Sequence, residues 1–122
     1  MFFNKGLADA AQAANRSSTY RMMLVTQSLI QGFYTVPKRL GKPFNPLLGE
    51  TFELVTPNFR YFSESVSHHP PIFCINCQGK GYEVRRTIES VQQFTGKQVR
   101  IFDKNKAEVY LNVGDRTELY KF

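Results

Sequence analysis

The spacing of hydrophobic positions divides the chain into a helical first part and a strand-rich remainder. Residues 7–14 are rich in alanine and favour a helix by propensity. A second helix is expected over residues 19–34, with Ser17 or Ser18 as its N-cap, and Gly32 and Pro37 bracket its end. The apolar residues at helical spacing that are expected to face a core are Met22, Val25, Leu29 and Phe33.

From residue 50 onward apolar and polar residues alternate, which is typical of β-strands. Strands are expected at residues 50–56, 60–66, 72–77, 82–89, 92–96, 98–102, 107–113 and 117–121. Turn-forming residues predict hairpin-type turns at 57–58, 78–81 and 103–106. Because short connections join antiparallel neighbours, the sequence predicts an α+β fold, with N-terminal helices packed on an antiparallel β meander. A run of strands with mixed faces also suits the wall of a barrel.

Two polar clusters flank the first two expected strands. Residues 42–50 read Lys-Pro-Phe-Asn-Pro-Leu-Leu-Gly-Glu, and residues 64–71 read Glu-Ser-Val-Ser-His-His-Pro-Pro. The prolines hold the first cluster extended and stop ladder pairing after the second. Since an even number of strands returns the chain to its starting side, both clusters are expected at one rim of the sheet. The polar side chains expected to converge there are Lys42, Asn45, His68 and His69.

An ammonium, an amide and two imidazoles favour phosphate binding over acid–base catalysis. Glu50 and Glu64 border the set, but the sequence contains no nucleophile elbow, glycine-rich phosphate loop or metal triad to support a hydrolase. We interpret Glu64 as an orienting partner for the backbone or a histidine, and Glu50 as the start of a strand. The chain is therefore not expected to be an enzyme.

The two clusters together resemble the signature of the oxysterol-binding-protein-related lipid-transfer domain. The usual form of the second motif is Glu-Gln-Val-Ser-His-His-Pro-Pro, so this chain differs at one position, where Ser65 replaces glutamine. The similar elements run in the same order from about Leu7 to the last residue. The resemblance implies a large, incompletely closed β-barrel with a helical layer, holding one lipid in a tunnel.

Residues 1–122 are expected to form the N-terminal part of that domain, without its lid and its C-terminal part. The segment 72–77 is nearly apolar on both faces, as expected where helices cover the outside of the barrel and lipid fills the inside. The resemblance further implies exchange of a sterol or other lipid for phosphatidylinositol 4-phosphate between membranes. No cofactor, metal or covalent step is implied.

The resemblance carries the head-group role onto matching positions. Lys42 and Asn45 correspond to ligands of the inositol phosphate, and His68 and His69 to the histidines that contact the phosphate. The residues expected to support them are Pro43, Phe44, Leu47, Leu48, Glu64 and Ser67.

Composition and charge agree with a protein that meets anionic membranes. The chain has 122 residues, 42% of them hydrophobic, enough for one domain with a modest core. Its formal charge is +6, and residues 1–45 carry six Lys or Arg against one Asp, which favours an anionic partner. No apolar run approaches the ~20 residues of a membrane span, and no signal peptide is evident. A cytoplasmic protein, peripheral at membranes and in transient contact with them, is expected.

Two alternatives remain open. His68 and His69 lie within ten positions of Cys74 and Cys77, which raises the possibility of a metal or redox site. Residues three apart on a strand point to opposite faces, however, so the two thiols are not expected to converge. The basic charge and the aromatic strands are also compatible with a nucleic-acid-binding β domain. The basic residues cluster before the sheet, however, and no RNP-like run is present. Nucleic acid is therefore not expected as a partner.

Overall fold

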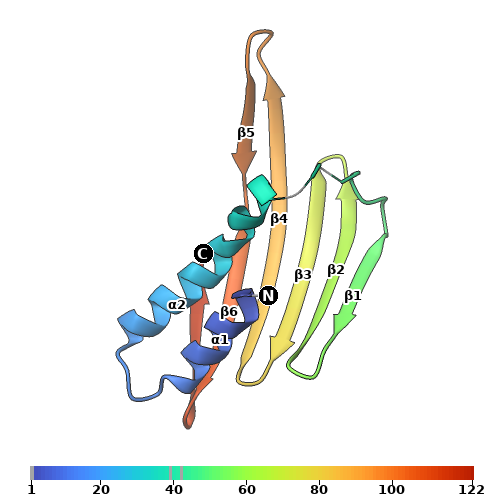
Figure 1. Ribbon diagram of the computed structural model, residues 1–122. Helices are drawn as coiled ribbons and strands as arrows, with labels where there is room; N and C mark the ends of the chain where they lie inside the picture. The colour runs from blue at the N-terminus through green and yellow to red at the C-terminus, as the bar shows by residue number, and fades with distance from the viewer. Residues whose placement is uncertain (1, 39, 42) are drawn as a thin grey trace.

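Helices lie across one face of a β-sheet in the computed structural model, which describes residues 2–38, 40–41 and 43–122 (Figure 1). The helices are α1 (Phe2–Gln12), α2 (Ser18–Ile30) and the 3-10 helix η1 (Gln31–Lys38). The strands are β1 (Thr51–Val55), β2 (Phe59–His68), β3 (Pro71–Gly79), β4 (Tyr82–Phe94), β5 (Val99–Asp103), β6 (Lys106–Val113) and β7 (Arg116–Lys121). In the part of the chain that the structure describes, no helix is long and apolar enough to cross a membrane.

Every strand pairing in the described sheet is antiparallel, in the order β1-β2-β3-β4-β6-β7, with β5 paired to β4 beside this path. The described strands do not close into a barrel. The predicted α+β class, with helices on an antiparallel sheet, is therefore confirmed. Figure 1 shows the β4–β5 hairpin extending well past the other strands.

One predicted hairpin is wrong. Residues 103–106 join β5 and β6, which do not pair with each other. β6 pairs with the first half of β4, and β5 pairs with the last residues of β4. β5 and β6 therefore lie end to end along β4. The junction is tied to Glu89, whose carbonyl accepts from the Lys104 N–H at 2.8 Å and whose N–H donates to Asn105 Oδ1 at 3.2 Å. The segments predicted as separate strands at 82–89 and 92–96 are one strand, β4. Turn residues mark where a chain changes partner, but they do not say which strands pair.

The sheet has one apolar face, and the helices cover part of it. The register aligns Tyr61, Cys77, Val84 and Val109 across four strands, and α1 packs over β4 and β6. Burying a side chain of this size stabilises the fold by about 1.5–3 kcal/mol. The buried core consists of Leu7, Ala10, Val25, Phe59, Cys77, Tyr82, Val84, Val109, Leu111 and Val113.

The opposite face is largely polar, with the segment 72–77 as an exception. This segment was expected to be nearly apolar on both faces, with helices outside and lipid inside. The register puts Phe73, Ile75 and Cys77 on the helix-covered face, and it puts Ile72 and Cys74 on the other face together with Asn76. The segment is therefore nearly apolar on both faces.

Helix α2 begins where Ser17 caps it: Ser17 Oγ accepts a hydrogen bond from the Tyr20 N–H at 3.2 Å. Its buried side is rotated from the predicted stripe. Val25 is buried and Leu29 packs against the core, as predicted, but Met22 is 50% exposed, and Phe33, which lies in η1, is 73% exposed. The residues of α2 that are buried are Arg21, Val25 and Ser28.

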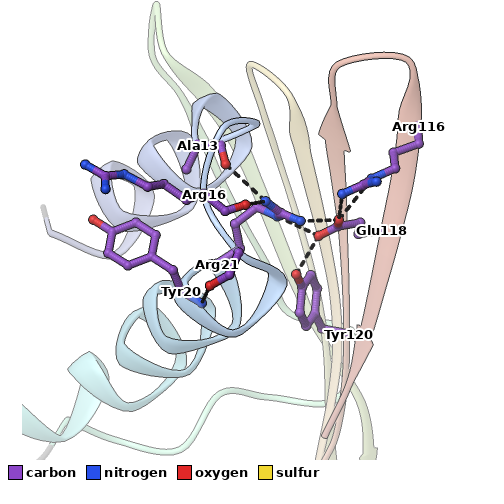
Figure 2. A network of polar contacts seen from close by, with 8 residues as sticks. Ala13, Arg16, Tyr20, Arg21, Arg116, Glu118 and Tyr120 are labelled. Atoms are coloured by element: carbon purple, nitrogen blue, oxygen red, sulfur yellow. Dashed lines mark hydrogen bonds and ion pairs between the residues drawn. The ribbon is translucent and has the colours of Figure 1, made fainter.

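A buried arginine lies on the side of α2 that faces the core. Arg21 is 1% exposed and donates from Nε to Glu118 Oε2 at 2.7 Å, while Nη2 pairs with the other carboxylate oxygen (Figure 2). Its Nη1 donates to the carbonyls of Ala13, at 3.1 Å, and Arg16, and Tyr120 Oη donates to Glu118 at 2.6 Å. The pair thus joins α2, the connection from α1, and β7. The hydrogen bonds from Arg21 lower the pKa of Glu118 to about 2.

The contribution of this pair to stability depends on pH. The folded pKa of Glu118 lies below its ordinary value of 4.5, so the contribution is complete above about pH 4.5 and is lost as pH falls towards 2. Glu118→Gln should lower the free energy of unfolding at pH 7 and flatten its fall across that window, measured by urea unfolding at a series of pH values.

Arg116→Gln is the matched control for this experiment. Arg116 contacts the same carboxylate at 2.9 Å but its side chain is 66% exposed. Exposed ion pairs contribute about 0–1 kcal/mol, so this change should leave the pH profile near that of the unaltered chain. Equal profiles for Glu118→Gln and the unaltered chain would contradict the role of the buried pair.

Candidate functional site

The loop between η1 and β1 is closed by its last residues. Gly49 has a φ of +77°, a backbone conformation that favours glycine, and the Glu50 N–H donates to the Leu47 carbonyl at 3.0 Å. The Glu50 carboxylate accepts from the Leu47 N–H at 2.7 Å, a charge-assisted bond. Glu50 therefore does more than precede a strand, since its side chain holds the turn of residues 47–50.

The loop is joined directly to β2. The Gly49 N–H donates to the Ser65 carbonyl at 2.8 Å, and the Ser65 N–H donates to the Glu50 carbonyl at 3.0 Å. These bonds continue the β1–β2 ladder, in which Thr51 lies opposite Glu64. The first polar cluster consequently ends beside the second, at the rim of the sheet where β2 turns into β3 (Figure 1).

The two histidines lie at that turn. A β-bulge between Ser65 and Ser67 shifts the register of β2 just before its end. The rings of His68 and His69 contact edge-on, with centroids 4.7 Å apart and planes at 64°, and the His69–Pro70 peptide bond is cis. Both side chains are exposed, and neither forms a hydrogen bond to another residue that the structure describes. Their ring N–H groups are therefore available to a ligand.

Asn45, His68 and His69 line one hollow of about 400 Å³ at the rim, together with Pro70 and Pro71. Its other wall is residues 90–92 of β4. The sequence did not indicate this wall, because it follows the histidines by some twenty positions and reaches them only through the β3–β4 register.

The remaining predicted site residues are placed as follows. Lys42 lies outside the described residues. Phe44, Leu47 and Leu48 are at least 66% exposed and, like Pro43, do not line the hollow. Glu64 and Ser67 are half-buried on β2 and do not line it either. The Glu64 carboxylate makes no hydrogen bond to a histidine in the described part of the chain.

A second hollow, of about 250 Å³, is lined in part by residues 63–65, near the end of β2. It includes Pro46, which follows Asn45, and Ser65, which precedes His68 by three residues. The apolar side chains that line it on the helix-covered face of the sheet are Phe52, Tyr61, Phe73, Ile75 and Ile88. Phe52 and Tyr61 contact edge-on, with ring centroids 6.0 Å apart. The hollow with Asn45 and the two histidines and the hollow with these apolar side chains are thus lined by residues that lie close together along the chain.

The cysteines do not come together. Cys77 is buried on the helix-covered face, and Cys74 lies on the other face, as the strand periodicity predicted. Burial raises the pKa of the Cys77 thiol to about 11, which keeps it protonated and unreactive. Within the described ranges no group of three or more His, Cys, Asp or Glu residues is arranged to hold a metal ion.

The chain belongs to the oxysterol-binding protein family, whose model matches residues 1–122. Human oxysterol-binding protein-related protein 6 is 40% identical over 94 residues, which cover 75% of this chain and 10% of the relative. The crystal structure of the Osh1 ORD domain in complex with cholesterol is similar, with a TM-score of 0.82 and 30% identity over 96% of this chain and 28% of that one. The Osh3 ORD of Saccharomyces cerevisiae in complex with PI(4)P has a TM-score of 0.72 and 31% identity over 95% of this chain and 31% of that one. The chain thus spans about a tenth of the human relative and less than a third of these structures.

The loop geometry predicts a contrast between two glycines. No atom lies within 4 Å of a Cβ added at Gly49 or at Gly32, but only Gly49 of the two has a positive φ. Gly49→Ala should therefore lower the free energy of unfolding by about 1 kcal/mol through backbone strain, whereas Gly32→Ala should be neutral or slightly stabilising. Urea unfolding of both variants measures the difference, and equal effects would mean that the turn at residues 47–50 is not required.

Proposed function

We propose that the rim hollow binds the phosphorylated head group of phosphatidylinositol 4-phosphate through Asn45, His68 and His69, with Lys42 as a further ligand. The observation that carries this proposal is that an amide and two imidazoles from separate segments line one hollow. Imidazole N–H groups and an amide donate to phosphate oxygens, and such charge-assisted bonds contribute about 1.5–3 kcal/mol each.

The second, apolar hollow would receive the apolar part of the lipid, or a sterol in its place. Phe52, Tyr61, Phe73, Ile75 and Ile88 would form an apolar surface for an acyl chain or a sterol ring, while the charged residues of the lining are Glu50 and Glu64. The related Osh3 domain is described in complex with PI(4)P and the related Osh1 domain with cholesterol, which supports both kinds of ligand.

In this proposal residues 1–122 contribute the helical layer and the rim of a lipid-transfer domain. The domain would exchange a sterol or other lipid for phosphatidylinositol 4-phosphate between membranes, by binding and release without covalent chemistry. It would act in the cytoplasm as a peripheral protein. The surplus of positive charge in residues 1–45 would favour transient contact with anionic membrane surfaces.

The double variant His68→Ala/His69→Ala tests the head-group site. Loss of two charge-assisted bonds should weaken binding to vesicles that contain phosphatidylinositol 4-phosphate by about 100-fold or more. Co-sedimentation with phosphatidylcholine vesicles, with and without this lipid, measures the change. Cholesterol binding should persist, because the apolar hollow is intact.

Arg60→Ala is the control for a general loss of charge. Arg60 is exposed near the β1–β2 turn, at the end of the sheet opposite the histidines, and should not affect binding (Figure 1). Vesicles in which phosphatidylserine supplies the negative charge provide a second control. An equal loss of binding to both anionic vesicles, or an equal effect of Arg60→Ala, would contradict the head-group assignment.

A further inference from the structure

Ser65 both holds the site's loop through its backbone and lines the apolar hollow. Its backbone N–H and carbonyl bond to Glu50 and Gly49. Its side chain is 2% exposed, and its register with Phe73 places it on the helix-covered face of the sheet. Ser65 is one of the residues that line the hollow of about 250 Å³, and among the described residues its buried Oγ has no hydrogen-bond partner.

A buried hydroxyl without a partner is costly. Nearly all buried side-chain polar atoms in proteins are hydrogen-bonded, because the water they leave is otherwise not replaced. Alanine at this position would fill almost the same volume without that cost. The hydroxyl is therefore explained by a partner that enters the hollow, where the other wall residues around it are mostly apolar.

The position of Ser65 indicates which part of a lipid that partner is. Ser65 precedes His68 by three residues, about 10 Å along an extended strand. A glycerophospholipid whose phosphorylated head group lies against His68 and His69 would bring its glycerol backbone to Ser65. Its chains would then lie against Phe73 and Ile75. The acceptors at the glycerol level of such a lipid are its ester carbonyl oxygens.

We propose that the Ser65 hydroxyl donates a hydrogen bond to an ester carbonyl oxygen of the bound glycerophospholipid. This inference rests on the proposed head-group site and adds a contact that distinguishes ester-linked from ether-linked lipids. The backbone bonds of Ser65 to the loop fix the position of its side chain. The β-bulge that follows it lets the chain turn towards the rim.

The test compares Ser65→Ala with the unaltered chain on two ligands, ester-linked phosphatidylinositol 4-phosphate and its dialkyl ether counterpart, in vesicles. The unaltered chain should bind the ester-linked lipid about fivefold to tenfold more tightly, the worth of one hydrogen bond. Ser65→Ala should lose this preference and bind both lipids as weakly as the unaltered chain binds the ether. The interaction energy of this variant–ligand cycle isolates the contact.

Thermal unfolding without lipid provides a second readout. Removing an unpaired hydroxyl should leave Ser65→Ala as stable as the unaltered chain or more stable. Ser63→Ala is the matched control: Ser63 lies two residues earlier on the same face and lines the same hollow, but its hydroxyl is not a buried, unpaired group. It should keep the preference for the ester.

The outcomes separate this inference from the proposed function. Equal binding of both lipids by the unaltered chain would overturn the ester contact while leaving the head-group site intact. Failure to bind either lipid would overturn both proposals. Lower stability of Ser65→Ala, with equal loss for both lipids, would assign the hydroxyl to a structural water. An equal loss of cholesterol binding would assign it to a sterol, and either result overturns the ester contact.

Discussion

The antiparallel pairing of β1 with β2 is the constraint on which the site depends. With Thr51 opposite Glu64, the residues just before β1 must lie beside the last residues of β2. The bonds between Gly49, Glu50 and Ser65 extend the ladder to the point where the loop leaves it. A slip of β2 by one residue would turn Ser65 and Tyr61 to the polar face, and a slip of β1 would turn Phe52 out of the hollow. Backbone hydrogen bonds thus place the loop before β1 next to the end of β2, where the histidines lie.

The single apolar face of the sheet serves two purposes. Over β4 and β6 it is covered by α1, and the ion pair between Arg21 and Glu118 holds α2 at the β7 side. Over β1, β2 and β3 the same face lines the apolar hollow. Moving a charged pair out of water is costly unless its geometry is good, and the carbonyls of Ala13 and Arg16 complete the hydrogen bonding of Arg21. Because these partners come from three segments, they determine where the helices lie.

Local patterns predicted much of this structure. The alternation of apolar and polar residues and the two motifs predicted β1, β2 and the turn that carries the histidines. They succeeded there because neighbouring strands joined by tight turns pair with each other. The patterns failed where partners are distant. Arg21 was not among the helix residues expected to face the core, since nothing nearby reveals a carboxylate 97 positions away. The patterns also missed that residues 90–92 line the hollow at the rim and that β5 and β6 both pair with β4. These pairings, too, depend on residues far apart in the sequence. Lys42 stays a prediction, outside the described residues.

Ser65 shows how one position can couple loop stability to ligand choice. Its backbone bonds to Glu50 and Gly49 do not depend on its side chain, so substitutions there can alter the hollow without detaching the loop. Glutamine, the usual residue of the family motif, would carry its amide further into the hollow and occupy space that serine leaves open. An aliphatic residue would remove the donor. In the proposed site, the side chain at this position would therefore set both the depth of the hollow and the polar group that a lipid meets below its head group.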